Sequence, residues 1–503
     1  MVFNRLDWFW LGRAIARPLR RFIPFVSVVV LAAIAVLGSR QPAAASEARL
    51  HSELEFGPPP EIVLPPYEQF TLANGMAVYL IEDRELPLIS GQALVRTGSR
   101  WEDPSLTGLA AVTGAALRSG GTEQHPAAEL DRLLEDRAAA IESSIDLSSG
   151  SVSFSALSED TDFILDLFAE VLQTPAFAPD KIAFEQQQLR GAIARRNDDP
   201  GSIASREFDK LIYGDQSPYA ATIEYDTLSR IDRAAVVDFY RRYFVPSNLI
   251  LGISGDFDTA TLRRAIEQRF GSWAATAPPP PPIPTATPGD REGQLFIVDR
   301  PQLTQSSVLM GHLGGQVDDP DYAQLSVANG ILNGFGGRLF NELRSSQGLA
   351  YSVYGYWSPE FDYPGRVIAG GQTRSDGTVP FIEGLRREFQ RLRDEPVSAE
   401  ELAYAQDSTL NSFIFRFADP SQTLSRLMTY AYYGYPEDFI FRYQEAVKAT
   451  TIADIQRVAR THLHPDRLTT LVVGNRSAIA PPLETIGKPI RALDVTIPPD
   501  PSA

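Results

Sequence analysis

Two side chains that can donate hydrogen bonds, Arg344 and Tyr351, lie seven residues apart in the second half of the sequence. Residues 338–345 are predicted to form a helix, and Gly348 suits a left-handed C-cap at its end. A strand should follow, with Tyr351 and Val353 on one face. The guanidinium and the phenol could then point into a common space, as one charged and one neutral donor.

The element that must position this pair is a glycine-rich turn just before the predicted helix. Gly334, Gly336 and Gly337 allow a backbone with positive φ, and they let the turn approach another chain closely. The rest of the sequence is then interpreted as the scaffold that holds this stretch in place.

The composition is that of a globular protein with two or more domains. The chain has 503 residues, of which 44% are hydrophobic and 22% charged, which is enough apolar material for a large core. Cysteine is absent. Disulfides, thiolate metal sites, cysteine nucleophiles and a lipid-acceptor cysteine are therefore excluded, and packing must supply the stability.

The first 45 residues have the pattern of an export signal peptide. Basic residues precede an apolar run at 22–38, and Ala43, Ala44 and Ala45 suit a cleavage site after Ala45. An uncleaved membrane anchor is the alternative, because about 17 apolar residues is the lower limit for a spanning helix. Either way the body is expected outside the cytoplasm, in the periplasm or an equivalent compartment.

The mature chain is expected to be strongly acidic. The formal charge of the full sequence is −17, and removing the six Arg and one Asp of residues 1–45 leaves 40 basic and 62 acidic residues, a charge of −22. Nucleic acid is not expected as a partner, because neutralising phosphates requires a basic surface. A membrane is expected as a partner only if the leader stays attached.

Apolar periodicity predicts mixed strands and helices in the first half. Residues 46–67 are proline-rich and are predicted to form an extended arm. Strand character at 70–81 and 88–97 surrounds a hairpin signal at Asn74-Gly75. Without strict βαβ alternation, the pattern favours an α+β fold with an antiparallel or mixed sheet. The other predicted elements are helices at 106–117, 127–141, 160–172, 179–196, 203–213 and 234–243, and strands at 151–156 and 249–254.

A polyproline segment at 276–290 divides the chain into two parts that repeat each other. The segment 99–121 aligns without gaps with 315–337, and a second pair of blocks begins near Leu228 and Val447. The offsets are 216 and 219, and chance would not preserve the register over two blocks. The sequence therefore predicts two homologous α+β domains of about 220 residues. They are placed at 68–275 and 291–480, with a tail at 481–503.

Four motifs, taken in order, resemble the insulinase/pitrilysin-like peptidase family, the inverzincins, in its shorter two-domain form related to mitochondrial processing peptidase. The likeness extends over residues 68 to about 478, and it implies two peptidase-like domains in a clam-shell arrangement. The motifs are L-A-N-G-M-A-V-Y-L-I (72–81), G-S-R-W-E-D-P-S-L-T-G-L-A (98–110), R-R-N-D-D-P (195–200) and G-G-R-L-F-N-E-L-R-S-S-Q-G-L-A-Y-S-V (336–353).

The zinc motif of that family is missing from this sequence. The family's H-x-x-E-H places two His ligands and the Glu that activates the zinc-bound water on one helix. The matching positions here are Ala111, Gly114 and Ala115, and the third ligand, a Glu in the family, would fall at Gly191 or Ala192. The resemblance therefore implies a chain with no metal of its own.

No other pattern in the sequence replaces that site. None of the five histidines has a carboxylate and a second histidine at helix spacing. His462 and His464, just before Pro465, are interpreted as capping or surface residues, and the acidic runs as solvated faces. A G-x-S-x-G nucleophile elbow is absent. The histidines are His51, His125, His312, His462 and His464.

The resemblance gives Arg344 and Tyr351 a role. In related peptidases the second half carries an Arg and a Tyr at this spacing, facing the zinc helix of the catalytic half, where they hold substrate backbone and stabilise the developing oxyanion. One such donor can contribute about a hundredfold in rate. The three glycines of the turn would contact the same substrate. The alternative is a structural Arg at a helix C-terminus beside a core Tyr.

Together these implications favour a zinc-less subunit of an exported, two-chain zinc metallopeptidase. A zinc-bearing paralogue would supply H-x-x-E-H and the metal, while this chain would contribute Arg344 and Tyr351 in trans to a peptide substrate. Alone, the chain is expected to be inactive. A peptide-binding or scaffold protein with the same fold is the alternative, and an independent hydrolase that uses other residues is a third possibility.

Overall fold

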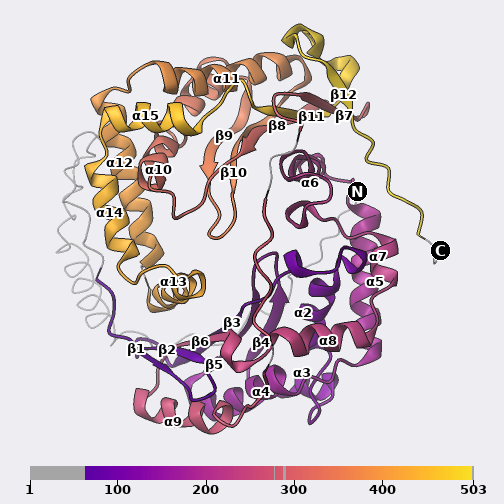
Figure 1. Cartoon of the computed structure of the whole chain (residues 1–503), viewed down its shortest axis with the longest axis vertical. Coiled ribbons are helices and arrows are strands. Elements are labelled where there is room, and N and C mark those ends of the chain that lie inside the picture. The colour runs from indigo at the N-terminus through magenta and orange to yellow at the C-terminus, as the bar shows by residue number, and fades with distance from the viewer. Residues whose placement is uncertain (1–62, 277, 287–289, 418, 501–503) are drawn as a thin grey trace, which may run out of the picture. The chain divides into compact units, whose positions relative to one another are not determined.

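Two six-stranded mixed sheets, one on each side of the proline-rich segment, organise the chain in a computed structural model (Figure 1). The structure describes residues 63–276, 278–286, 290–417 and 419–500. The predicted leader and the arm up to residue 62 lie outside these ranges. Among the described residues, no helix has the length and apolar character needed to cross a membrane. The predicted α+β class is confirmed.

The N-terminal sheet has a hairpin at one edge and β4 at the other. Strands β2 and β6 are parallel, and every other neighbouring pair is antiparallel. The hairpin turns at Gly75, as predicted, and its φ of +91° lies in the region that glycine adopts without strain. The strand order is β1 (Glu68–Thr71), β2 (Ala77–Glu82), β6 (Leu249–Gly255), β3 (Leu88–Val95), β5 (Gly150–Leu157) and β4 (Ala140–Ile145).

The C-terminal sheet repeats this topology and ends at the edge strand β9. Strand β7 is parallel to β11 and β12, and the other pairs are antiparallel. Five strands therefore match in order and direction, and only the outermost strand differs, because β12 comes from the C-terminal tail. The order is β12 (Ile490–Ala492), β7 (Leu295–Asp299), β11 (Thr469–Gly474), β8 (Gln305–Leu313), β10 (Arg366–Arg374) and β9 (Ala350–Ser358).

The helices repeat in the same way. In the N-terminal half they are α2 (Leu109–Ser119), α3 (Ala127–Glu135), α4 (Thr161–Gln173), α5 (Pro179–Arg195), α6 (Pro200–Tyr213), α7 (Tyr225–Ser229), α8 (Arg233–Tyr243) and α9 (Thr259–Phe270). In the C-terminal half they are α10 (Tyr322–Leu332), the π-helix η7 (Phe340–Ser346), α11 (Thr378–Asp394), α12 (Ala399–Ile414), α13 (Pro420–Tyr433), α14 (Phe439–Ala449) and α15 (Ile452–His462).

One helix of each half packs on the sheet of the other half. Helix α6 lies beside the C-terminal sheet (Figure 1). Its apolar residues, including Phe208, pack with Leu309 of β8 and Leu471 of β11. Helix α13 of the C-terminal half packs on the N-terminal sheet, where Leu424 contacts the apolar cluster that contains Ile250 of β6. Both helices begin with Asp-Pro, and in both the Asp side chain accepts a hydrogen bond from a first-turn backbone N–H. The exchange joins the halves through apolar surface.

One predicted helix, residues 127–141, is wrong at its C-terminal end. The helix α3 stops at Glu135, and the edge strand β4 begins at Ala140. Between them Ala138 adopts a φ of +49°, a left-handed conformation that no helix can continue. The alanine run that favours a helix by propensity is overridden here by pairing of β4 with β5.

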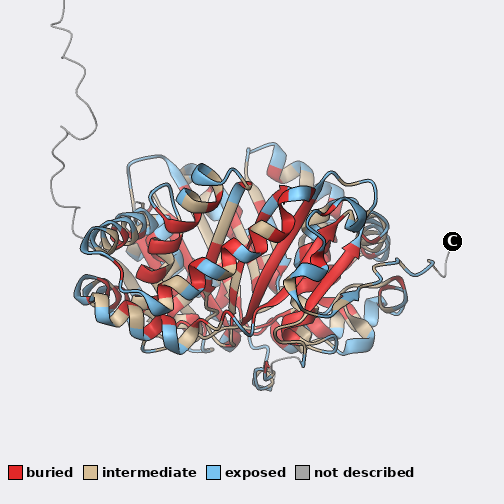
Figure 2. Cartoon of the chain, turned by 90° about the horizontal axis from the view of Figure 1, so that it is seen from above, coloured by how far each residue is buried: buried red, intermediate tan, exposed pale blue. Residues whose placement is uncertain are grey.

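Buried residues concentrate on the strands and on the helix faces turned toward them (Figure 2). Each half has its own large apolar cluster. Fully buried Phe168 and Phe270 anchor the first cluster, and Phe381 and Phe389 the second. Two smaller clusters, formed where α6 and α13 pack on the sheet of the opposite half, lie between these cores.

A buried ion pair and the proline-rich segment also connect the two halves. The Arg100 guanidinium donates to both carboxylate oxygens of Asp362 at 2.8 and 2.9 Å, and its side chain is 2% exposed. Near it, Trp101 Nε1 donates to the Pro282 carbonyl at 3.2 Å, so that the segment is held against the N-terminal half. This pair is the most deeply buried bidentate ion pair among the described residues.

Burial keeps His312 of β8 in its neutral form, and two backbone groups contact its ring nitrogens. Its Nδ1 lies 2.7 Å from the Leu313 carbonyl, and its Nε2 accepts from the backbone N–H of His464 at 3.2 Å. Burial lowers the pKa of His312 to about 4, below the ordinary value near 6.5. The charged ring has no acceptor for a second N–H proton, so protonation opposes folding.

This histidine should make stability depend on pH between about 6.5 and 4. In that window the unfolded chain binds a proton at His312 that the folded chain does not, so stability falls as the pH falls. The difference in free energy of unfolding between wild type and His312→Gln should therefore shrink on going from pH 7 to pH 4.5. Urea denaturation at both pH values measures it, and a constant difference would contradict the assignment.

Candidate functional site

Arg344 and Tyr351 lie against each other at one end of the edge strand β9. The guanidinium carbon of Arg344 is 4.6 Å from the ring centroid of Tyr351 and 4.6 Å from that of Phe340. The guanidinium is therefore held between two aromatic rings, an arrangement that fixes its plane without occupying its N–H donors with a carboxylate. The structure brings the predicted donor pair together.

The exposure of the pair separates it from structural arginines nearby. Tyr351 is 82% exposed, so it is not a core tyrosine. Arg344 forms no ion pair with any carboxylate that the structure describes, whereas Arg338, six residues earlier, is buried and binds Glu401 through two contacts of 2.6 and 3.1 Å. One arginine thus anchors the turn to α12, and the other is available to a ligand.

The helix carrying Arg344 is a π-helix, a rare form that is frequent at functional sites. Buried Leu343 holds it against the core. The helix stops where Gly348 adopts a φ of +59° and donates its N–H to the Arg344 carbonyl at 3.2 Å. The predicted left-handed cap is therefore present, and it sends the chain directly into β9 and Tyr351.

The glycine-rich turn differs in part from its prediction. Only Gly334 has a positive φ, +79°. At positions 336 and 337 glycine is required because a side chain has no room. A Cβ on Gly337 would lie 2.1 Å from the Asn333 carbonyl oxygen, and a Cβ on Gly336 would lie 2.8 Å from the ring of Tyr404. Gly334 and Gly336 are exposed, whereas Gly337 is buried.

Two asparagines that sequence reasoning missed, one on α10 and one at its C-cap, close one end of the β9 edge. Asn329 donates to the Trp357 carbonyl and accepts from its N–H, at 2.9 and 2.8 Å. Asn333 does the same for Gly355, at 2.6 and 2.9 Å. Their spacing of four residues on one helix face is the only sequence signal. Asparagine side chains therefore cover the backbone at the far end of the edge, and the end carrying Tyr351 lacks this cover.

The positions that match the zinc motif lie on α2, whose N-terminus is capped by Glu102. Its carboxylate accepts the backbone N–H of Gly108 at 3.0 Å and that of Ala110. Burial raises the pKa of Glu102 to about 7, and these two hydrogen bonds oppose the rise. Glu102 thus acts as a cap for the first turn of the helix.

Ala111 and Ala115 are half-buried on α2 with methyl side chains, and Gly114 lies against the edge strand β4. A Cβ on Gly114 would be 2.5 Å from the backbone nitrogen of Ile145. The Ser143 hydroxyl also donates to the Gly114 carbonyl at 2.6 Å. The helix and the strand are therefore so close that a glutamate at position 114 has no room for its side chain.

The position of the third ligand, Gly191, is on α5, which packs against α2. Ser119 at the end of α2 donates to Glu185 of α5 at 3.0 Å. A Cβ on Gly191 would meet nothing within 4 Å. The structure thus places the matching positions on two adjoining helices, but methyl groups and hydrogen atoms cannot ligate zinc. These residues do not fit the metal of the family.

Gly114→Ala should destabilise the chain by about 1–3 kcal/mol, because the new methyl group must push helix from strand. Gly191→Ala is the matched control. It adds the same group at an open helical position, and it should stabilise by about 0.5–1 kcal/mol through helix propensity. Urea denaturation of both variants measures the contrast. Similar changes of one sign would contradict the close approach of α2 and β4.

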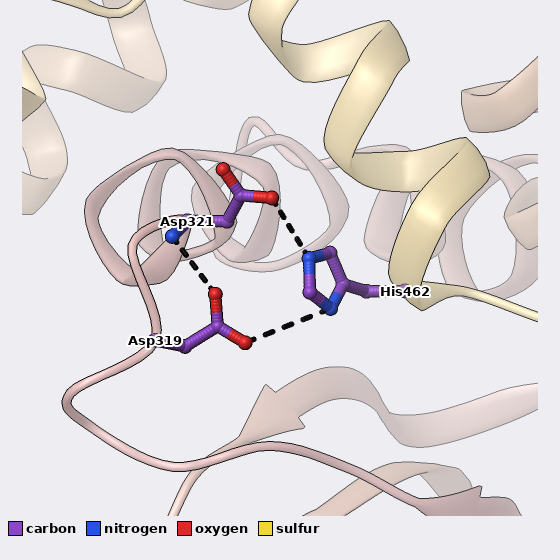
Figure 3. A group of neighbouring side chains, drawn as sticks. All are labelled: Asp319, Asp321 and His462. Atoms are coloured by element: carbon purple, nitrogen blue, oxygen red, sulfur yellow. Dashed lines mark hydrogen bonds and ion pairs between the residues drawn. The ribbon is translucent and has the colours of Figure 1, made fainter.

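The structure also gathers Asp319, Asp321 and His462 (Figure 3). His462 Nε2 lies 2.9 Å from Asp321, and its Nδ1 lies 4.0 Å from Asp319. Arg457 binds the same Asp321 carboxylate at 2.8 Å. The arginine neutralises a ligand that a cation would need, so this group acts as an ion-pair network that ties α15 to the start of α10. His462 is thus a structural residue.

Two models of one peptidase family match the chain. The insulinase model of peptidase family M16 matches residues 89–216, and the model of the M16 inactive domain matches residues 230–409. Together they cover more than half of the sequence. The first match contains α2 and α5, and the second contains Arg344, Tyr351 and β9.

Relatives and solved structures agree with this match. The uncharacterized zinc protease YmxG of Bacillus subtilis is 21% identical over 363 residues, 71% of this chain and 86% of that protein. An uncharacterized zinc protease of Rickettsia bellii is 23% identical over 414 residues, covering 80% and 96%.

Among solved structures, a peptidase M16 inactive domain from Pseudomonas fluorescens has a TM-score of 0.72 at 24% identity, covering 81% of this chain and 98% of that one. A protease from Helicobacter pylori has a TM-score of 0.71 at 20% identity, covering 82% and 100%. At these identities the likeness establishes the fold. With both family models in sequence order and the duplicated fold in place, the chain belongs to the insulinase-like M16 peptidase family.

Proposed function

We propose that this chain is the zinc-less subunit of an exported heteromeric peptidase, and that Arg344 and Tyr351 act on a peptide bound at the metal centre of a paralogous partner. The observation that carries the proposal is the state of the pair. Two donors are held side by side at an exposed strand end, and no described carboxylate occupies the guanidinium. Such donors are suited to bind an oxygen atom that gains negative charge during a reaction.

The contribution of each residue follows from its surroundings. Phe340 and Tyr351 fix the plane of the Arg344 guanidinium, so its N–H groups can bind a carbonyl oxygen with little loss of rotamer freedom. The Tyr351 hydroxyl adds a neutral donor from the neighbouring strand. Both donors are placed before substrate arrives, and this preorganisation is what lets hydrogen bonds favour a transition state over a ground state.

The hydrolytic centre is assigned to another chain because the positions that match the zinc motif in this chain do not fit the metal. Ala111, Gly114, Ala115 and Gly191 offer no ligand atoms, and the contact of Gly114 with β4 excludes the Glu of the motif. The printed names of the relatives refer to zinc proteases. A scaffold role without catalysis is the competing function. Both functions predict that the isolated chain is inactive, but only the proposed one predicts that Arg344 and Tyr351 contribute to the activity of a complex.

Zinc content and peptide hydrolysis of the purified chain test the first half of the proposal. The isolated chain should hold far less than one zinc per molecule after mild chelation, and it should not hydrolyse unstructured peptides. Adding zinc should change neither result. Zinc near one equivalent per chain that survives chelation, or hydrolysis that depends on added zinc, would contradict the assignment of the metal to a partner.

The leader supports the proposed location, the periplasm or an equivalent compartment, because residues 1–45 carry the pattern of an export signal. A solved relative with a TM-score of 0.69 and 16% identity, which covers 88% of this chain and 50% of its own length, is described as the periplasmic protease PqqL of Escherichia coli.

A further inference from the structure

A polar cavity of about 560 Å³ lies between α10, α12 and the C-terminal end of the edge strand β9. Gly334 of the glycine-rich turn forms part of its wall, as does Trp357 of β9. The lining contains two arginines, Arg416 and Arg426, and neither Asp nor Glu. The cavity therefore lies at the end of β9 opposite to Tyr351, and it carries two positive charges.

Neither arginine forms an ion pair with any carboxylate in the part of the chain that the structure describes. Elsewhere in the same half, Arg338 pairs with Glu401 and Arg457 with Asp321. The full sequence has 63 acidic residues against 46 basic ones, so carboxylate partners are plentiful. The cavity thus holds two guanidinium groups that no described carboxylate neutralises.

The two charges share one neighbourhood. Burial raises the pKa of Tyr322 and also that of Tyr430, and in both cases Arg416 and Arg426 oppose the rise. Both guanidinium groups are therefore close enough to act on the same two phenols, and they repel each other there. An anion bound between them would offset that repulsion.

The neutral groups of the wall suit a carboxylate. Ser408 and Thr409 of α12 line the cavity and can donate through their hydroxyls, whereas the Ser412 hydroxyl already donates to the Thr409 carbonyl at 2.9 Å. A guanidinium binds a carboxylate through two parallel hydrogen bonds, which are stronger than those between neutral groups. A volume of about 560 Å³ accommodates one or two residues of a peptide, and the space is not shaped for a single small ion.

The position of the cavity fits a peptide that reaches Tyr351. Strand β9 leads from Tyr351 to Trp357, a length of about 20 Å at roughly 3.3 Å per residue. Because Asn329 and Asn333 already bind the backbone of Trp357 and Gly355, a peptide cannot add as a strand there. It can only place a side chain or its terminus in the cavity beyond.

We propose that this cavity binds a carboxylate of the substrate peptide, either an acidic side chain or the C-terminus, about six residues from the bond that Arg344 and Tyr351 contact. The inference rests on the proposed function, because it takes the ligand to be a peptide. It assigns a preference for acidic peptides to the chain that lacks the metal. Recognition of the peptide and its hydrolysis are then divided between two subunits.

Fluorescence anisotropy of the purified chain with rhodamine-labelled peptides of about eight residues tests the proposal. One peptide has a single Glu and an amidated C-terminus, a second has Gln in its place, and a third has Gln and a free C-terminus. The Glu or the free-carboxylate peptide should bind about tenfold or more tighter than the neutral one. Whichever of these two peptides binds more tightly shows whether the cavity takes an acidic side chain or the C-terminus.

The double substitution Arg416→Gln/Arg426→Gln should abolish that preference, and Arg416→Lys/Arg426→Lys should retain part of it. Arg241→Gln/Arg264→Gln removes the same charge from exposed positions of the other half and should leave the preference intact. Equal affinity for charged and neutral peptides, binding of none of them, or a preference that survives in Arg416→Gln/Arg426→Gln overturns the proposal. No partner and no activity enter this measurement, so its failure is distinct from failure of the proposed function.

Discussion

Tyr351→Phe in the assembled complex should lower kcat by about a hundredfold and lower kcat/KM by the same factor. The substitution removes one hydroxyl and keeps the ring that supports the Arg344 guanidinium at 4.6 Å. A donor that binds the oxygen only when charge develops on it contributes to the transition state and not to substrate affinity. Steady-state kinetics on a peptide substrate separate the two cases, since a donor that only holds substrate would raise KM instead.

The controls for this prediction lie in the same half of the chain. Tyr404→Phe removes the hydroxyl of another exposed tyrosine, on α12, and should leave kcat unchanged. Arg344→Lys keeps the charge but loses the planar fork, and it should recover only part of the activity that Arg344→Ala loses. Assembly of each variant is verified by size-exclusion chromatography. Assembled complexes with unaltered activity would leave only a structural role for the pair.

Asp362→Ala should cost about 3–5 kcal/mol of stability, because it leaves the Arg100 guanidinium buried without its partner. Arg100 is 2% exposed, and both of its bonds to Asp362 are shorter than 3 Å. The pair links the N-terminal half to the loop after β9. The two halves of the variant should therefore unfold in separate steps in urea, where the wild type unfolds in one.

Two further variants isolate the cause of that loss. Glu445→Ala breaks an exposed ion pair with Lys448 on α14 and should change stability by less than about 0.5 kcal/mol. Replacing Arg100 and Asp362 together by Leu should cost less than Asp362→Ala alone, because no charge is then left unpaired. A single substitution as mild as Glu445→Ala would show that the buried charge finds another partner.

Much of the fold could be predicted from local signals. The hairpin at Gly75, the helix α5 and the two-block repeat each rest on turn residues, apolar periodicity or register. The break at Ala138 could not, because the alanines there favour a helix and only the pairing of β4 with β5 overrides them. The packing of α6 and α13 on the sheet of the opposite half could not be predicted either, because an apolar helix face does not indicate which sheet it will cover.

The candidate site divides in the same way. Arg344, Tyr351 and the cap at Gly348 follow from spacing, and the structure places them together. The roles of Asn329 and Asn333 depend on their distance from β9, about which spacing along α10 says nothing. The unpaired state of Arg416 and Arg426 is likewise a property of tertiary structure, because an arginine shows its partners only after folding.

Isolation of this chain in its native complex tests the central claim most directly. The complex is taken from the native source under mild conditions, its subunits are identified by mass spectrometry and its zinc is counted per complex. The account predicts a second chain of the same family that carries H-x-x-E-H, together with about one zinc per pair of chains. A homo-oligomer of this chain alone, or a complex in which every family member lacks that motif, would contradict it.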